Sequence, residues 1–293
     1  MEFDIIEIQK LFKSSKLDYE LVDYKIMSGT TDGRVIQLIT TNGSKLVLKF
    51  DHPNEIKIGA DLLNLYQESS LLPKIIYLAH DWSHIIYTFI EGTTHFNRGD
   101  KKLWLIRLVD DLLNKYKPYT AEGSWGRLGY FRSSWMEFNV TSVEEAKNNI
   151  GNILSYEDYI FARSQVLKLY SDYSTEKYLL HGDTGVHNFV FNQSRLIGVI
   201  DPSPMAGPLI YDFIYAFCSS PDDIDLDTLL TAYNHLKQGL VDKERLIDEV
   251  SVQLYCRIGL SIKHHPNDLS EYLLAWKHWR DLCKQLEEGI SIL

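Results

Sequence analysis

The spacing of apolar residues divides this 293-residue chain into two parts of different character. Up to about residue 91, the apolar runs are short and are separated by turn signals. Positions 35–40 are rich in β-branched residues, Asn42 and Gly43 follow, and an apolar run returns over 45–50. Asn-Gly between two such runs is the strongest short-range signal of a β-hairpin. The first part therefore begins as an antiparallel sheet.

The remaining elements of this part complete a small lobe. Residues 4–13 have the pattern of an amphipathic helix, and residues 54–68 form a second helical stretch. Pro73 precedes another apolar strand, and residues 85–90 give a further one. We expect a mostly antiparallel sheet with one helix packed across it.

After residue 91 the pattern is helical. In the first helix, apolar residues recur every three or four positions, the period of one buried face: Leu103, Ile106, Val109, Leu113 and Tyr116. Further helices are expected over 157–173, 225–239, 243–262 and 268–287. One β-hairpin interrupts them, with strands over 189–191 and 196–200. The fold class is therefore α+β, with a β-rich N-lobe over 1–91, a larger helical C-lobe over 92–293, and a ligand cleft between them.

Composition excludes several classes of protein. The formal net charge is −10, which is the wrong sign for a general nucleic-acid binder. No stretch approaches 18 uncharged apolar residues, which argues against a membrane span. The start lacks a basic segment followed by an apolar run, and three distant cysteines form no disulfide framework. We expect a cytoplasmic globular protein, either monomeric or dimeric.

The most informative residues surround one loop and the hairpin that follows it. Asp183 and Asn188 stand five apart in the sequence His-Gly-Asp-Thr-Gly-Val-His-Asn, and Asp201 ends the second strand of the hairpin. The hairpin should therefore return Asp201 to the side of Asn188. A carboxylate and an amide oxygen suit Mg²⁺, and Asp183 remains free to accept a proton from a hydroxyl. This combination is typical of phosphoryl transfer.

These residues resemble a known family, the aminoglycoside phosphotransferases and their choline-kinase-like relatives, over nearly the whole chain. The resemblance implies a protein-kinase-like fold with two lobes, and ATP and Mg²⁺ as cofactors. It implies that Asp183 is the catalytic residue and that Asn188 and Asp201 hold the metal ion. Gly207 with Asp212 resembles the Gly-x-x-x-x-Asp segment of the family, whose Asp is usually structural.

Shorter matches resemble the hygromycin B phosphotransferases within this family. They are Trp125-Gly126, the Trp-Met-Glu-Phe segment over 135–138, and the Arg-Ile-Gly-Leu segment over 257–260. They indicate a subfamily and leave the substrate open.

The N-lobe supplies the expected phosphate-binding residues. Strand alternation places Lys49 on the face opposite Leu46 and Leu48. The resemblance implies that Lys49 reaches the α and β phosphates of the nucleotide. The loop that begins with Ser28 and Gly29 lets backbone amides approach phosphate.

Two further nucleotide-site features follow from the same resemblance. A helix carboxylate should pair with Lys49, with Glu55 as the first choice and Asp61 as the second. Glu55 has an alternative role as a charge that favours the helix N-terminus. The segment over 85–92 resembles an interlobe hinge, so that the Thr88 carbonyl and the Ile90 amide would face adenine.

The leading hypothesis is an ATP-dependent kinase acting on a hydroxyl of an aminoglycoside-type acceptor. The alternatives are a kinase of choline, a sugar or an amino alcohol, and a nucleotide-binding protein without turnover; ATP and GTP are not distinguished. The segment between Asp201 and Asp212 is too short for a long activation segment, which favours a small molecule over a protein substrate. Carboxylates on the helical lobe would attract a cationic acceptor, and the candidates are Asp222, Asp223, Asp225, Glu271 and Asp281.

Overall fold

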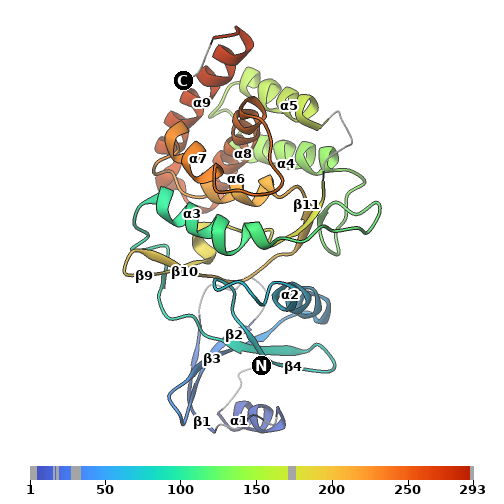
Figure 1. Ribbon diagram of the computed structural model, residues 1–293, viewed down its shortest axis with the longest axis vertical. Helices are drawn as coiled ribbons and strands as arrows, with labels where there is room; N and C mark the ends of the chain where they lie inside the picture. The colour runs from blue at the N-terminus through green and yellow to red at the C-terminus, as the bar shows by residue number, and fades with distance from the viewer. Residues whose placement is uncertain (1–4, 16, 18–19, 28–33, 171–175, 291–293) are drawn as a thin grey trace.

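The protein consists of two lobes stacked along the long axis, as the computed structural model shows (Figure 1). The structure describes residues 5–15, 17, 20–27, 34–170 and 176–290. The N-lobe carries a five-stranded sheet, and the C-lobe carries most of the helices. The expected α+β, two-lobed architecture is therefore confirmed.

The N-lobe sheet is antiparallel throughout and has the strand order β1-β2-β3-β5-β4. Its strands are β1 (Leu21–Ile26), β2 (Arg34–Thr40), β3 (Lys45–Phe50), β4 (Ile75–Leu78) and β5 (His84–Thr88). The strands expected around Asn42-Gly43 and near residue 85 are confirmed. Strand β1 was not predicted, because it is an edge strand with four of its six residues exposed and has little apolar alternation.

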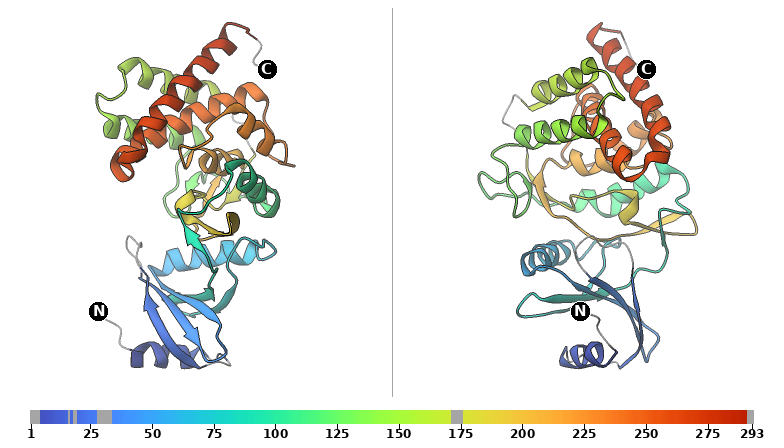
Figure 2. Two further views of the ribbon diagram at one scale, coloured as in Figure 1. Left: turned by 90° about the vertical axis from the view of Figure 1, so that its left-hand side faces the viewer. Right: turned by 180° about the vertical axis from the view of Figure 1, so that it is seen from behind.

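The two faces of this sheet pack against different helices. Leu46 and Leu48 lie in a buried cluster with Ile8 of helix α1 (Ile5–Ser14). On the opposite face, Ile85 packs with Ile56 of helix α2 (Pro53–Leu65). Because side chains alternate along a strand, Lys49 lies on the α2 face, as the sequence predicts. That face is the one turned toward the C-lobe (Figure 2).

The C-lobe is built around one large hydrophobic core. Its helices are α3 (Lys101–Asp111), α4 (Trp135–Ile150), α5 (Tyr156–Tyr170), α6 (Ile210–Cys218), α7 (Leu226–Tyr233), α8 (Lys243–His264) and α9 (Leu269–Glu287), with short 3₁₀ turns η1 (Leu113–Lys115), η2 (Val186–Asn188) and η3 (Pro266–Asp268). Helices α4 and α6 were not predicted. Helix α6 is short, almost entirely buried and mostly apolar, and a short apolar run cannot be assigned to a helix or a strand with certainty from the sequence. Helix α7 ends six residues earlier than the predicted 239. No helix in the described ranges is long and apolar enough to cross a membrane.

Two small sheets lie where the lobes meet. The first contains β6 (Thr93–Thr94), β9 (Phe189–Asn192) and β10 (Arg195–Val199), and it confirms the predicted hairpin. The second contains β7 (Gly126–Arg127), β8 (Tyr178–Leu180) and β11 (Met205–Gly207). A Cβ atom on Gly92 would lie 2.4 Å from the carbonyl oxygen of Phe191. Glycine therefore lets the interlobe connection pass directly against β9.

Candidate active site

A tight turn after β8 presents Asp183. Gly182 has φ +80°, and a Cβ atom there would lie 2.0 Å from the carbonyl oxygen of Ser203. Only glycine accommodates both the left-handed backbone and this close approach. The Ser203 amide donates to the carbonyl of His181 at 2.9 Å, which fixes the turn against the segment after β10.

Asp212, at the start of α6, anchors this turn from beneath. Its carboxylate accepts the Gly182 amide at 3.1 Å and the Tyr116 hydroxyl at 2.6 Å. The same hydroxyl accepts the His181 amide at 3.0 Å, and the Thr184 hydroxyl donates to the Asp212 carbonyl at 2.7 Å. Burial raises the pKa of Asp212 to about 6, although these hydrogen bonds oppose the shift. Asp212 therefore has the structural position that the resemblance implies.

The Asp183 carboxylate is held by two neighbours in its own loop. The Asn188 amide nitrogen donates to it at 2.9 Å, and His187 Nε2 lies 3.1 Å from the same oxygen. Burial opposes ionisation of Asp183, but the hydrogen bond and charge of His187 outweigh it. The pKa of Asp183 is brought to about 2, so the group is a carboxylate at neutral pH. Sequence reasoning did not identify His187, although it stands four residues after Asp183.

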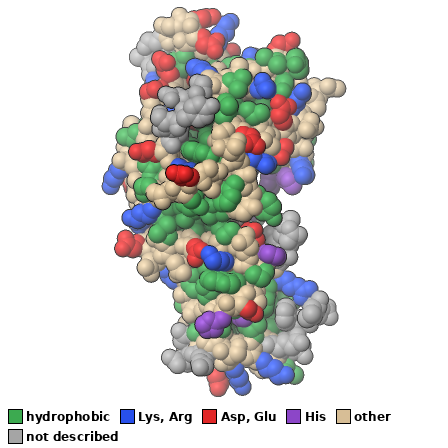
Figure 3. Space-filling view, turned by 90° about the vertical axis from the view of Figure 1, so that its right-hand side faces the viewer, with side chains coloured by type: hydrophobic (Ala, Val, Ile, Leu, Met, Phe, Trp, Pro, Cys, Tyr) green, Lys and Arg blue, Asp and Glu red, His purple; other side chains and the backbone are tan. Residues whose placement is uncertain are grey.

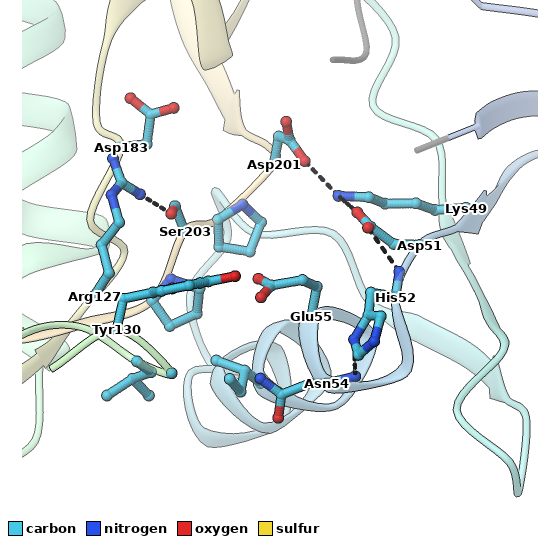
Figure 4. A pocket seen from close by; sticks show the side chains of 15 residues that line it. Lys49, Asp51, His52, Asn54, Glu55, Arg127, Tyr130, Asp183, Asp201 and Ser203 are labelled. Atoms are coloured by element: carbon cyan, nitrogen blue, oxygen red, sulfur yellow. Dashed lines mark hydrogen bonds and ion pairs between the residues drawn. The ribbon is translucent and has the colours of Figure 1, made fainter. Parts of the chain in front are cut away.

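Asp201 returns to the side of Asn188, as the hairpin predicts. The Ile200 amide donates to the main-chain carbonyl of Asn188 at 2.9 Å. Asp201 has φ +54°, an uncommon conformation for a residue with a side chain. Its carboxylate is about half exposed and points into the space between the lobes (Figure 4).

A cavity of about 680 Å³ joins these residues to the N-lobe. Lys49 lines it together with Asp183 and Asp201 (Figure 4). The Lys49 ammonium lies 2.7 Å from Asp201 Oδ1 and 3.5 Å from Asp51 Oδ2. Burial disfavours the charged lysine, but the two carboxylates outweigh it and raise the pKa of Lys49. One cation from the N-lobe and two carboxylates from the C-lobe therefore face one space.

The structure differs from the expected pairing of Lys49 with a carboxylate of helix α2. Among the described residues, the ion pairs of Lys49 are with Asp201 and Asp51. Asp61 instead pairs with Lys57 one helical turn earlier, at 3.0 Å. Glu55 lines the same cavity from the first turn of α2, which also gives it a favourable position relative to the helix dipole. The predicted Glu55 and Asp61 pairings are thus corrected, because Asp51 and Asp201 lie closer to the ammonium.

The loop around β7 contributes a cation that sequence reasoning missed. Arg127 lines the cavity, hydrogen-bonds to the Ser203 hydroxyl, and lies beside Asp183 (Figure 4). Tyr130, from the same loop, points into the cavity next to Glu55 (Figure 4). The sequence match at Trp125-Gly126 lies in this segment but does not include Arg127 or Tyr130.

The structure does not test the residues predicted to contact adenine and the phosphates of the nucleotide. Ser28 and Gly29 lie outside the described residues. Thr88 ends β5, where its hydroxyl accepts the amide of Lys74 at 2.9 Å. The Ile90 side chain lies against Gly198, where an added Cβ would meet it at 2.6 Å. Neither Thr88 nor Ile90 lines the cavity that contains Lys49, so their contact with adenine stays a prediction.

The structure does not gather the five predicted acceptor carboxylates at one place. Asp222 and Glu271 line a second cavity, described below. Asp223 is exposed, and Asp225 caps helix α7 by accepting the Thr228 amide at 2.8 Å. Asp281 lines a separate cavity between α5 and α9. Figure 3 shows acidic and basic side chains interspersed on one face rather than gathered in an acidic patch.

Comparison with known proteins supports the fold. No family model and no curated protein matches the sequence. Among solved structures, the GDP and kanamycin complex of APH(2")-IIia is 14% identical, with TM-score 0.61, covering 94% of this chain and 99% of that one. A macrolide 2'-phosphotransferase from Brachybacterium faecium is 11% identical, with TM-score 0.61 and coverages of 93% and 96%. A thermostable variant of the aminoglycoside phosphotransferase APH(4)-Ia, in a ternary complex with ADP and hygromycin B, is 13% identical, with TM-score 0.57 and coverages of 94% and 98%. The chain therefore has the protein-kinase-like fold of these phosphotransferases.

Proposed function

We propose that this protein is an ATP- and Mg²⁺-dependent kinase that transfers the γ-phosphoryl group to a hydroxyl of a small molecule. The observation that carries the proposal is the shared cavity of Lys49, Asp183 and Asp201 between the lobes. Phosphoryl transfer needs little covalent chemistry from the protein, so catalysis consists of positioning and of stabilising charge. These three groups supply both requirements.

The donor set fits a magnesium ion. Asp201 offers a carboxylate that faces the cavity, and Asn188 offers an amide oxygen, since its amide nitrogen is held by Asp183. Two oxygen ligands completed by phosphates and water are the usual protein contribution to an Mg²⁺ site. The bound ion would neutralise charge on the phosphates. No group of three or more His, Cys, Asp or Glu side chains within the described ranges is placed to hold a metal by itself, which is consistent with a site shared with the nucleotide.

Three residues of the chain have separate roles in the proposed phosphoryl transfer. The Lys49 ammonium pairs with the nucleotide phosphates. The phosphates then take the place of the carboxylates that pair with Lys49 in this structure. Asp183 accepts the hydrogen bond of the attacking hydroxyl and orients it. A carboxylate with a pKa of about 2 is a weak base, so it takes the proton late, as the new P–O bond forms. Arg127 places positive charge beside the transferring group.

The nucleotide and the acceptor have narrower assignments within this proposal. Main-chain groups of Thr88 and Ile90 would hold adenine, and Ser28 and Gly29 would approach the phosphates. The bound GDP and ADP of the similar structures support a nucleotide substrate. An aminoglycoside-type acceptor is supported by the sequence resemblance and by the kanamycin and hygromycin B of those structures.

The test is an ADP-release assay with ATP and Mg²⁺ over a panel of hydroxylated acceptors, which includes kanamycin, hygromycin B, choline and simple sugars. We expect one class of acceptor to stimulate ADP release and to give a phosphorylated product. Asp201→Asn preserves the side-chain shape and tolerates the positive φ, and it should reduce turnover by about 10³-fold through loss of charge stabilisation at the metal. Wild-type turnover and unchanged Mg²⁺ dependence in that variant would remove Asp201 from the metal site.

A further inference from the structure

A second cavity, of about 260 Å³, adjoins the catalytic loop. His187 connects the two sites, because it lines this cavity while its Nε2 lies 3.1 Å from the Asp183 carboxylate. The polar lining comes from segments far apart in the sequence. The side chains that matter here are His95, Arg98, His187, Asp222, Arg257 and His265.

Arg257, on helix α8, is the most informative of these residues. It is only 6% exposed. Its Nε donates to the Tyr272 hydroxyl at 3.1 Å, and one terminal nitrogen donates to the Ser219 carbonyl at 2.7 Å. Within the described residues, no carboxylate forms an ion pair with it, and the other terminal nitrogen has no protein hydrogen-bond partner. A buried guanidinium without a counter-ion is costly, and the cavity that it lines has room for an anion.

Three histidines line the same cavity and can donate hydrogen bonds to an anion. The His95 ring centre lies 6.4 Å from that of His187 and 6.3 Å from that of His265. Burial lowers the pKa of His95 and His265, and the charge of Arg257 lowers both further, although Asp268 opposes the shift at His265. The arrangement is not a metal centre, since no such cluster in the described part of the chain is placed to hold an ion.

The acidic residues at this cavity do not neutralise its inner end. Asp222 is paired with Arg98 at 2.7 Å. Asp268 and Glu271 also line the cavity, but Glu271 is exposed on helix α9 and thus lies toward solvent. Arg257 at the buried end therefore has no carboxylate within ion-pair distance among the described residues, while the partly buried Asp268 acts electrostatically on His265.

We propose that this cavity binds a carboxylate or phosphate group of the acceptor, and that this contact brings the acceptor hydroxyl to Asp183. The inference rests on the proposed kinase function and names a different substrate class from the aminoglycoside-type acceptor that the resemblance supports: a hydroxylated acid or phosphate ester. The acceptor would span from Arg257 past His187 to the catalytic carboxylate. Arg257 is then a specificity-determining residue.

Anion binding can be measured without turnover. With the nucleotide site saturated by Mg²⁺ and a non-hydrolysable ATP analogue, inorganic phosphate and acetate are titrated separately while the ring C2–H NMR signals of His95 and His265 are followed. We expect saturable shifts of both signals, and the anion that binds more tightly distinguishes phosphate from carboxylate. Arg257→Gln should weaken that binding at least tenfold, and His265→Gln, at a partly exposed position, at least threefold. Arg280→Gln on α9, outside this cavity, is the matched control and should leave the affinity unchanged.

The proposal is overturned if neither anion produces saturable shifts, or if both cavity variants bind as wild type does. If Arg257→Gln fails to fold, His265→Gln decides the question alone. Anion binding without phosphorylation of any acceptor would reject the kinase function and leave the anion site. Turnover of kanamycin without anion binding would reject the anion site and leave the kinase function.

Discussion

The two sides of the interlobe cavity are held in different ways. On the C-lobe side, the turn that presents Asp183 is fixed by buried hydrogen bonds that converge on Asp212 and Tyr116. On the N-lobe side, Lys49 is held by ion pairs with Asp51 and Asp201, and the latter is about half exposed. We infer from this difference that the C-lobe residues are preorganised before a substrate binds, whereas Lys49 can exchange its carboxylate partners for groups of a substrate.

Replacing Lys49 should affect catalysis far more than stability. We expect Lys49→Met to lower kcat/KM for ATP by about 10²-fold, the usual effect of losing one group that stabilises developing charge. The free energy of unfolding should change by less than about 1 kcal/mol, because partly exposed ion pairs contribute little. Steady-state ADP release and urea unfolding measure the two effects. Lys45→Met on the same strand face is the control, and equal losses of activity in both variants would contradict a special role for Lys49.

Removing the hydrogen bonds between Tyr116 and the turn that presents Asp183 should, in contrast, lower the free energy of unfolding markedly. Tyr116→Phe removes the hydroxyl that donates to Asp212 and accepts the His181 amide, which leaves a buried N–H group unpaired. We expect a loss of about 1–3 kcal/mol in the free energy of unfolding, together with reduced kcat. Tyr255→Phe is the control, since that buried hydroxyl makes no hydrogen bond within the described residues. Unfolding curves in which the two variants coincide would show that the anchor is unimportant.

The pH dependence of stability tests the same anchor. Burial raises the folded-state pKa of Asp212 to about 6 from an ordinary 3.8. Between these values the folded state binds more protons than the unfolded state, so this group lowers the unfolding free energy as pH rises from 4 to 6, by about 2 kcal/mol. His181, whose pKa burial lowers to about 4, acts in the opposite direction.

The difference between wild type and Asp212→Asn isolates the contribution of Asp212. Thermal unfolding at pH 4, 5 and 6 should show the variant losing more stability on acidification than wild type, because the stabilising protonation of Asp212 is absent from the variant. Parallel pH profiles for the two proteins would contradict the burial of an ionisable Asp212.

The smallest expected effect belongs to Asp225. Because its carboxylate caps helix α7, Asp225→Ala should cost about 1 kcal/mol of stability. Turnover should remain at the wild-type level, since the residue lies outside both cavities. Urea unfolding and the ADP-release assay check the two statements. Asp223→Ala is the control, since Asp223 is a nearby exposed carboxylate that does not cap α7. A specific rise in acceptor KM for Asp225→Ala would restore its predicted role at the substrate.

The sequence is informative where local pattern determines structure. Alternation along β3 predicts the face of Lys49, and the apolar strands around Asn192 predict the hairpin that returns Asp201 to Asn188. Helix α6 was not predicted because it is a short, mostly apolar run that is buried on nearly every side, and such a run is typical of both a buried strand and a buried helix.

Contacts between distant segments could not be predicted in this way. Glu55 was preferred as the partner of Lys49 from its place on a helix, but spacing along a helix does not reveal which carboxylate lies nearest in space. Asp51 was within reach of sequence reasoning, because it stands two residues after Lys49, directly beyond the end of β3. His95, His187 and His265 come together only through tertiary packing.

The central claim is that Asp183 orients the acceptor hydroxyl for phosphoryl transfer, and Asp183→Asn tests it most directly. The substitution keeps the size of the side chain and removes its negative charge. Acceptor-stimulated ADP release should fall by about 10²–10⁴-fold, while the affinity for Mg²⁺-ATP, measured by calorimetry, should stay at the wild-type value. Turnover near the wild-type rate in this variant would contradict the claim.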